Sequence, residues 1–188
     1  MNEQEFIRQQ VATERAHMGA TRAALAAALG ANYSDDVLET FARAAARYLG
    51  FIVRRFNAQD LEHCAILQAR VAATDQADRA ILSDLAATLR FSGQAIDALA
   101  AAVDAPAAEL LAACGAYNRF YTEVLGSRRH AIYHLFERHY GIVEWRQASF
   151  VDADSILEER ELYAAVASAL PAGLELRSPA RPTNKQGP

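Results

Sequence analysis

Carboxylate and histidine side chains recur at a regular short spacing in this chain of 188 residues. Glu14 stands three residues before His17, and Asp60 stands three residues before His63. Residues three apart lie on one face of a helix, and this carboxylate–His spacing is found in helical bundles that hold two metal ions. Metal coordination is therefore the first chemistry that the sequence indicates.

A second group of polar residues interrupts the apolar stripes of the expected helices. Such residues are costly to bury unless they pair with one another or hold a ligand. In an up-and-down bundle, residues equally far from a turn face each other, so His17 and Arg55 lie at one level. We expect one polar layer across the core. It either satisfies itself, with Glu14 offsetting a buried arginine and Gln59 bonding to His63, or it binds a ligand or metal. Its members are Glu14, His17, Arg55 and Gln59, with Ser92 and Arg128 as further candidates.

The elements that position these residues are helices. Only one of the five prolines, Pro106, lies before position 171, and the chain contains 42 alanines. Proline breaks helices and alanine favours them, so the body is helical. Apolar periodicity and capping residues place the helices, with a turn around Trp145 before the last one. The expected ranges are 3–29, 35–67, 75–103, 104–135 and 155–170.

Four long helices joined by short loops predict an all-α fold, an up-and-down antiparallel four-helix bundle with a short additional C-terminal helix. We expect one domain over residues 1–170 and a flexible tail over residues 171–188. Gly115 and Gly126 are expected to bend the fourth helix.

Composition limits the class of partner. The net charge of −4 and the absence of a basic stretch interleaved with aromatics argue against nucleic acid. The N-terminus lacks the pattern of a signal peptide, and the longest apolar run is too short to span a membrane. We therefore expect a soluble, cytoplasmic protein, in which Cys64 and Cys114 are reduced thiols.

The layout over about residues 10–150 resembles the hemerythrin-like family, small bundles that bind two non-haem irons through histidines and carboxylates. The segment from Glu14 to Arg22 is similar to the family's first-helix pattern, and RRFNAQDLEHCAIL to its second. LRFSGQAIDAL fits the third helix, and RRHAIYHLFERHYGIVEW fits the fourth, with a trailing tryptophan. The resemblance implies the bundle fold.

The resemblance also implies where iron ligands would stand. His17 matches a ligand position, whereas the second-helix His–Glu pair falls on Arg55 and Gln59 and the fourth-helix pair on Arg128 and Ile132. Arginine cannot lose its proton to become a ligand. In this register the resemblance argues against the usual di-iron centre.

A different register keeps more ligands. His130 and His134, four residues apart, share one helix face, and they would join the carboxylate–His pairs in a metal site. However, both histidines lie on the side of the helix opposite its apolar stripe. This position instead favours contact with solvent or with a second subunit.

Three functions follow as hypotheses, and the residues favour a binding protein over an enzyme. The first is a hemerythrin-like binding or sensing module whose di-iron site is degenerate or lost. The second is a working non-haem iron protein that handles iron, oxygen or peroxide and uses Glu14, His17, Asp60 and His63. The third is a metal-free structural or interaction protein, a homodimer packed through a helix face. Haem bound by His17 or His63 is a lesser alternative, and the identity of any cofactor or small-molecule ligand stays open.

Overall fold

The computed structural model describes residues 2–149 and 151–177. Within these ranges the chain is all-helical and contains no strand. Helix α1 begins after Asn2, whose side chain accepts a hydrogen bond from the Glu5 backbone while the Glu5 carboxylate accepts one from the Asn2 backbone. This reciprocal capping box satisfies two amides that no helical carbonyl reaches. The first three helices are α1 (Glu3–Leu29), α2 (Asp35–Arg70) and α3 (Gln76–Ala101).

The second half of the chain is more broken than predicted. One continuous helix was expected from about residue 104 to 135, and the structure contains several shorter segments there. The residues around Trp145, expected to form a turn, are helical as well. The segments are η1 (Ala102–Asp104), α4 (Ala107–Phe120), the π-helix η2 (Tyr121–Leu125), α5 (Gly126–Ala131), α6 (Tyr133–His139), α7 (Ile142–Ser149) and α8 (Ala153–Ser168).

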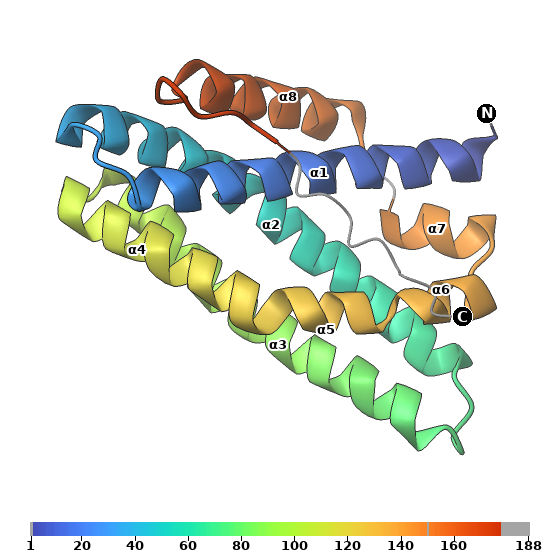
Figure 1. Ribbon diagram of the computed structural model, residues 1–188. Helices are drawn as coiled ribbons and strands as arrows, with labels where there is room; N and C mark the ends of the chain where they lie inside the picture. Colours follow the sequence, from blue (N-terminus) through green and yellow to red (C-terminus); the bar gives the residue numbers. More distant parts are fainter. Residues whose placement is uncertain (1, 150, 178–188) are drawn as a thin grey trace, which may run out of the picture.

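The last helix begins at Ala153, two residues before its expected start at residue 155. Asp152 is its N-cap, because the Asp152 carboxylate accepts hydrogen bonds from the backbone amide and hydroxyl of Ser155, both at 2.8 Å. After α8 the chain turns back beside it (Figure 1), and Leu174 and Leu176 pack against the apolar core. Of the tail predicted over residues 171–188, positions 178–188 lie outside the described residues.

Helix α2 is the central element, since it packs against α1, α3, α4, α7 and α8 (Figure 1). Its neighbours α1 and α3 run antiparallel to it. For α3 the side-chain contacts show this direction. Arg54 contacts Asp97, and Asn57, which comes later in α2, contacts Ser92, which comes earlier in α3. None of the described helices combines the length and the apolar character needed to cross a membrane.

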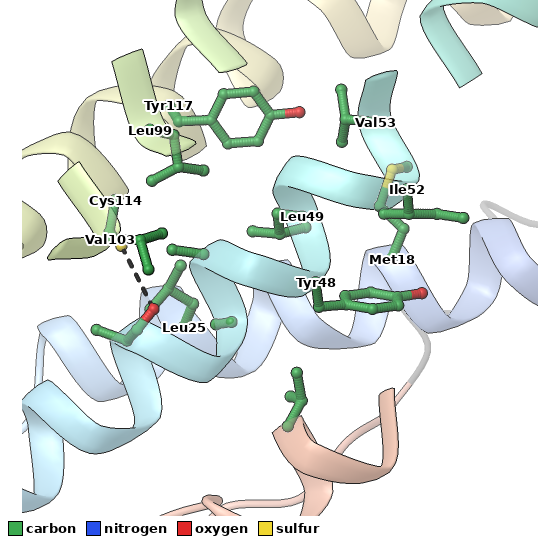
Figure 2. Packing of buried hydrophobic residues seen from close by; sticks show 14 of the residues in the cluster. Met18, Leu25, Tyr48, Leu49, Ile52, Val53, Leu99, Val103, Cys114 and Tyr117 are labelled. Carbon is green, nitrogen blue, oxygen red and sulfur yellow. Dashed lines mark hydrogen bonds between the residues drawn. The ribbon is translucent and has the colours of Figure 1, made fainter. Parts of the chain in front are cut away.

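Two apolar clusters fill the interior, one toward each end of α2. The first includes Leu25, Tyr48, Leu49 and Leu99, and Figure 2 shows it at close range. The second is built from the other end of α2, from α3, from the end of η2 and from α6 with the residue before it; it includes Cys64, Leu67, Leu82, Leu85, Leu89, Leu125, Ile132 and Leu135. The buried polar residues of α2 lie between these two clusters.

Candidate functional site

The middle of α2 carries the predicted polar layer, and the structure divides it into two clusters on different sides of the helix. Position on α2 decides the side, because residues two apart on a helix point in different directions. We call one group the α8 cluster: Glu14, His17, Tyr48, Arg55 and Glu159. We call the other the α5 cluster: Arg15, Asn57, Asp60, Ser92 and Arg129.

The α8 cluster joins α1, α2 and α8. The guanidinium of Arg55 forms an ion pair with the fully buried Glu14, with Nη2 and Oε2 2.5 Å apart. Glu159 Oε1 accepts a hydrogen bond from the Tyr48 hydroxyl at 3.0 Å and lies 3.0 Å from His17 Nδ1. Burial raises the pKa of Glu159, but the contacts with His17 and Tyr48 outweigh it and hold that pKa below its usual range. The cluster therefore keeps its carboxylate ionised.

Glu159 is not among the residues that the sequence predicts for the site, because it stands in a run of charged residues, Glu158 to Glu161. It is 1% exposed. Its spacing to Leu162 and Val166, three and seven residues on, places it on the apolar stripe of α8, and this was the available sequence signal. Tyr163 on the same helix stacks on the His17 ring, with ring centroids 3.9 Å apart.

The α5 cluster is centred on Asp60, which lies between two arginines. Arg15 donates to Asp60 Oδ1 at 2.6 Å, and Arg129 Nε lies 2.6 Å from Oδ2. Arg129 also donates to Asn57 Oδ1 at 2.9 Å, and Asn57 in turn donates to the Ser92 hydroxyl at 3.0 Å. Burial raises the pKa of Asp60, but the two guanidinium groups outweigh it and hold that pKa below its usual range.

Arg129 takes the place in the core that the sequence assigned to Arg128. The π-helix η2 contains wider turns, and the Gly126 backbone amide donates to the carbonyl of Tyr121, five residues back. One extra residue in a turn rotates the following helix by about 100°. Arg129 is consequently 4% exposed, whereas Arg128 lies at the surface, 2.6 Å from Asp84.

Gln59 and His63 do not bond to each other as the self-satisfied layer required. Gln59 is 8% exposed, and neither atom of its amide has a hydrogen-bond partner within the described ranges. His63 Nδ1 lies 2.9 Å from the Tyr140 hydroxyl, and its Nε2 lies 3.1 Å from the Ser149 hydroxyl. Burial lowers the pKa of His63 to about 4, so this imidazole is neutral at neutral pH.

The remaining metal-ligand candidates lie apart from the layer. His130 and His134 are exposed, and His134 Nε2 contacts Asp78 at 3.1 Å. Across residues 2–149 and 151–177, no three His, Cys, Asp or Glu side chains are grouped so that they could hold a metal ion. Cys64 and Cys114 are free, buried thiols, as predicted, and burial raises the pKa of each to about 12.

A cavity of about 250 Å³ adjoins the layer between α1, α7 and α8. Its wall is mostly apolar, with Phe6, Ile7 and Ile156, and it includes the polar side chains of Gln10 and Ser149. Gln10 donates to Glu14 at 2.8 Å, and Ser149 contacts His63. Two residues of the cavity wall therefore contact Glu14 and His63, which are two of the predicted site residues.

Comparisons of this chain with protein-family models, with curated proteins and with solved structures find no match.

Proposed function

We propose that this chain is a binding or sensing module built as a hemerythrin-like, up-and-down four-helix bundle, in which ion pairs stand where relatives would hold two irons. The observation that carries the proposal is the pairing of the layer's carboxylates with guanidinium groups. Glu14 is paired with Arg55, and Asp60 is paired with both Arg15 and Arg129.

These arginines supply the positive charge that a metal would otherwise bring to the carboxylates. A guanidinium stays protonated in proteins and has no lone pair to donate to a metal. Iron placed beside Arg55 or Arg129 would meet a fixed positive charge and carboxylates that are already engaged. The donor set therefore does not fit a di-iron centre.

A binding role is supported by buried polar groups that lack partners within the described part of the chain. They include the amide of Gln59 and the hydroxyl of Tyr117. The Tyr117 residue is 2% exposed. Unsatisfied buried polar groups are few in native proteins, and each calls for an explanation. Our explanation is that a bound molecule completes these hydrogen bonds.

Metal analysis of freshly purified protein tests the proposal. We expect less than stoichiometric iron, no absorption band of an oxo-bridged pair, and the same metal content in His17→Ala and His63→Ala variants. Two irons per chain that are lost in either variant would instead establish the working iron protein. A thermal-shift screen of small molecules completes the test, because a ligand that binds only the native state raises the Tm. A screen without a hit would favour the structural dimer.

A further inference from the structure

The positive charge of the α5 cluster exceeds its negative charge, although only Arg129 of its arginines is buried. Arg15 and Arg129 share the single carboxylate of Asp60. A third guanidinium, that of Arg22, lies over the Tyr121 ring at 3.5 Å from its centroid, and Arg129 lies over the same ring at 5.6 Å. In residues 2–149 and 151–177, Arg22 forms no ion pair; its Nη2 donates to the Asn118 carbonyl and the Thr122 hydroxyl. Two guanidinium groups thus share one carboxylate, and a third lies over the same aromatic ring as one of them.

Several hydrogen-bond donors around the Tyr121 ring have no acceptor within the same described ranges. These are Arg22 Nε, Arg129 Nη1 and the hydroxyl of Tyr117. In Figure 2 this hydroxyl points away from Cys114 and Leu99, toward the side where Val53, another member of the apolar cluster, is drawn. Burial raises the pKa of Tyr117, while the guanidinium groups of Arg129 and Arg22 act in the opposite direction, which places all three groups within electrostatic reach of one another.

The chemistry of these donors identifies the kind of ligand. An isolated buried charge is expensive unless it is paired, and arginine cannot relieve the cost by losing its proton. Guanidinium and phenol donors match the oxygen atoms of a small oxyanion, which accept charge-assisted hydrogen bonds. The π-helix η2 beside them is a feature that recurs at functional sites.

We infer that the chain binds a small oxyanion, a carboxylate or an inorganic oxyanion, between α1, α4 and η2, held by Arg22, Arg129 and the Tyr117 hydroxyl. The inference rests on the proposed binding role and names the chemistry of the ligand. Thr122 is exposed and Arg22 is half-buried, so the anion enters from the side of η2.

Titration of the full-length chain with formate, benzoate, nitrate and phosphate tests the inference, with sodium chloride at equal ionic strength as the reference. Isothermal calorimetry and the Tm are the measurements. We expect saturable binding of one anion per chain and a rise in Tm. Preference for formate or benzoate identifies an organic acid, and preference for nitrate or phosphate identifies an inorganic ligand.

Two variants with matched controls make the test specific. Tyr117→Phe removes only the unpartnered hydroxyl, so it should keep the Tm without anion and weaken anion binding about tenfold. Arg22→Met should abolish the binding. The controls are Tyr48→Phe, which loses a hydrogen bond to Glu159 and lowers the Tm, and Arg54→Met at the surface; both should retain wild-type affinity.

Absence of saturable binding, or equal binding by wild type and Arg22→Met, would overturn the inference. The metal content of the protein, which tests the proposed function, is measured without any added anion. The two conclusions can therefore fail separately.

Discussion

The two polar clusters on α2 have opposite charge ratios. In the α8 cluster two carboxylates, Glu14 and Glu159, face one guanidinium. In the α5 cluster two guanidinium groups share the carboxylate of Asp60. The difference matters because an excess of carboxylate and an excess of guanidinium suit different partners.

In the α8 cluster the second carboxylate, Glu159, has an uncharged hydrogen-bonding partner, because the Tyr48 hydroxyl donates to it, and it also contacts His17. In the α5 cluster the cations are arginines, whose positive charge is fixed. The anion inferred above would balance that fixed charge. The comparison separates a cluster that serves the fold from one that suits a ligand.

The largest effect is expected from Asp60→Asn. The substitution leaves Arg15 and Arg129 without their carboxylate, and breaking a buried pair costs about 3 to 5 kcal/mol of unfolding free energy. Urea denaturation measures this. Asp97→Asn is the control, because the Asp97 side chain is 70% exposed and that of its partner Arg54 is 53% exposed. This surface pair should contribute less than about 1 kcal/mol to the free energy of unfolding. Equal losses in the two variants would contradict the fixed-charge description of the α5 cluster.

The second effect concerns His63, an uncharged polar group on the same helix. Its pKa is about 4 in the folded chain and about 6.5 when unfolded. The unfolded state therefore binds more protons between these values, and unfolding free energy should fall by up to about 3 kcal/mol as the pH drops from 7 to 4. His63→Phe should flatten this slope in urea titrations, and His130→Gln at the surface should not. A slope unchanged in His63→Phe would show that His63 is not neutral when folded.

Glu159→Gln should cost less than Asp60→Asn, about 2 kcal/mol. The amide oxygen can still accept a hydrogen bond from the Tyr48 hydroxyl. Because the folded pKa of Glu159 is lowered, its carboxylate stabilises the fold above about pH 4, and this contribution is lost as the pH falls further. Urea unfolding at pH 7 and pH 3 should show a smaller gap between wild type and variant at pH 3. A loss as large as that of Asp60→Asn would erase the distinction between the clusters.

The smallest effect tests how the α5 cluster is positioned. A methyl group at Gly126 would lie 3.3 Å from the carbonyl oxygen of Tyr121, whereas one at Gly93 would have no atom within 4 Å. Gly126→Ala should destabilise the chain by about 1 kcal/mol, and Gly93→Ala should stabilise it by about 0.5 to 1 kcal/mol. Thermal unfolding compares them. Equal stabilisation by both would mean that η2 does not depend on Gly126.

Periodicity and breakers predicted the helical class and the bounds of the first helix, since Glu3 and Leu29 are marked by local capping and a following glycine. They predicted buried positions for Glu14, Arg55 and Ser92 because each interrupts an apolar stripe. The stripe method failed where the helix was not regular. It chose Arg128 over Arg129 because it assumed 3.6 residues per turn through η2.

Partnership was harder to predict than burial. The sequence placed Glu14 opposite an arginine, but it offered no reason to pair Asp60 with residues on both α1 and α5. Glu159 was missed because an acidic run conceals one buried member among exposed ones. Such pairings depend on helix rotation and packing angle, which single helix patterns do not contain.

The contact between His17 and Glu159 also has a consequence for biosynthesis. It joins residues 142 positions apart, and Tyr48 meets the same carboxylate across 111. A ribosome releases the N-terminal helices first, so α1 and α2 emerge well before the helix that completes their polar contacts. Until α8 emerges, the contacts of Glu159 with His17 and Tyr48 cannot form, and contacts so distant along the chain are associated with slower folding. During synthesis, the α5 side can close before the α8 side.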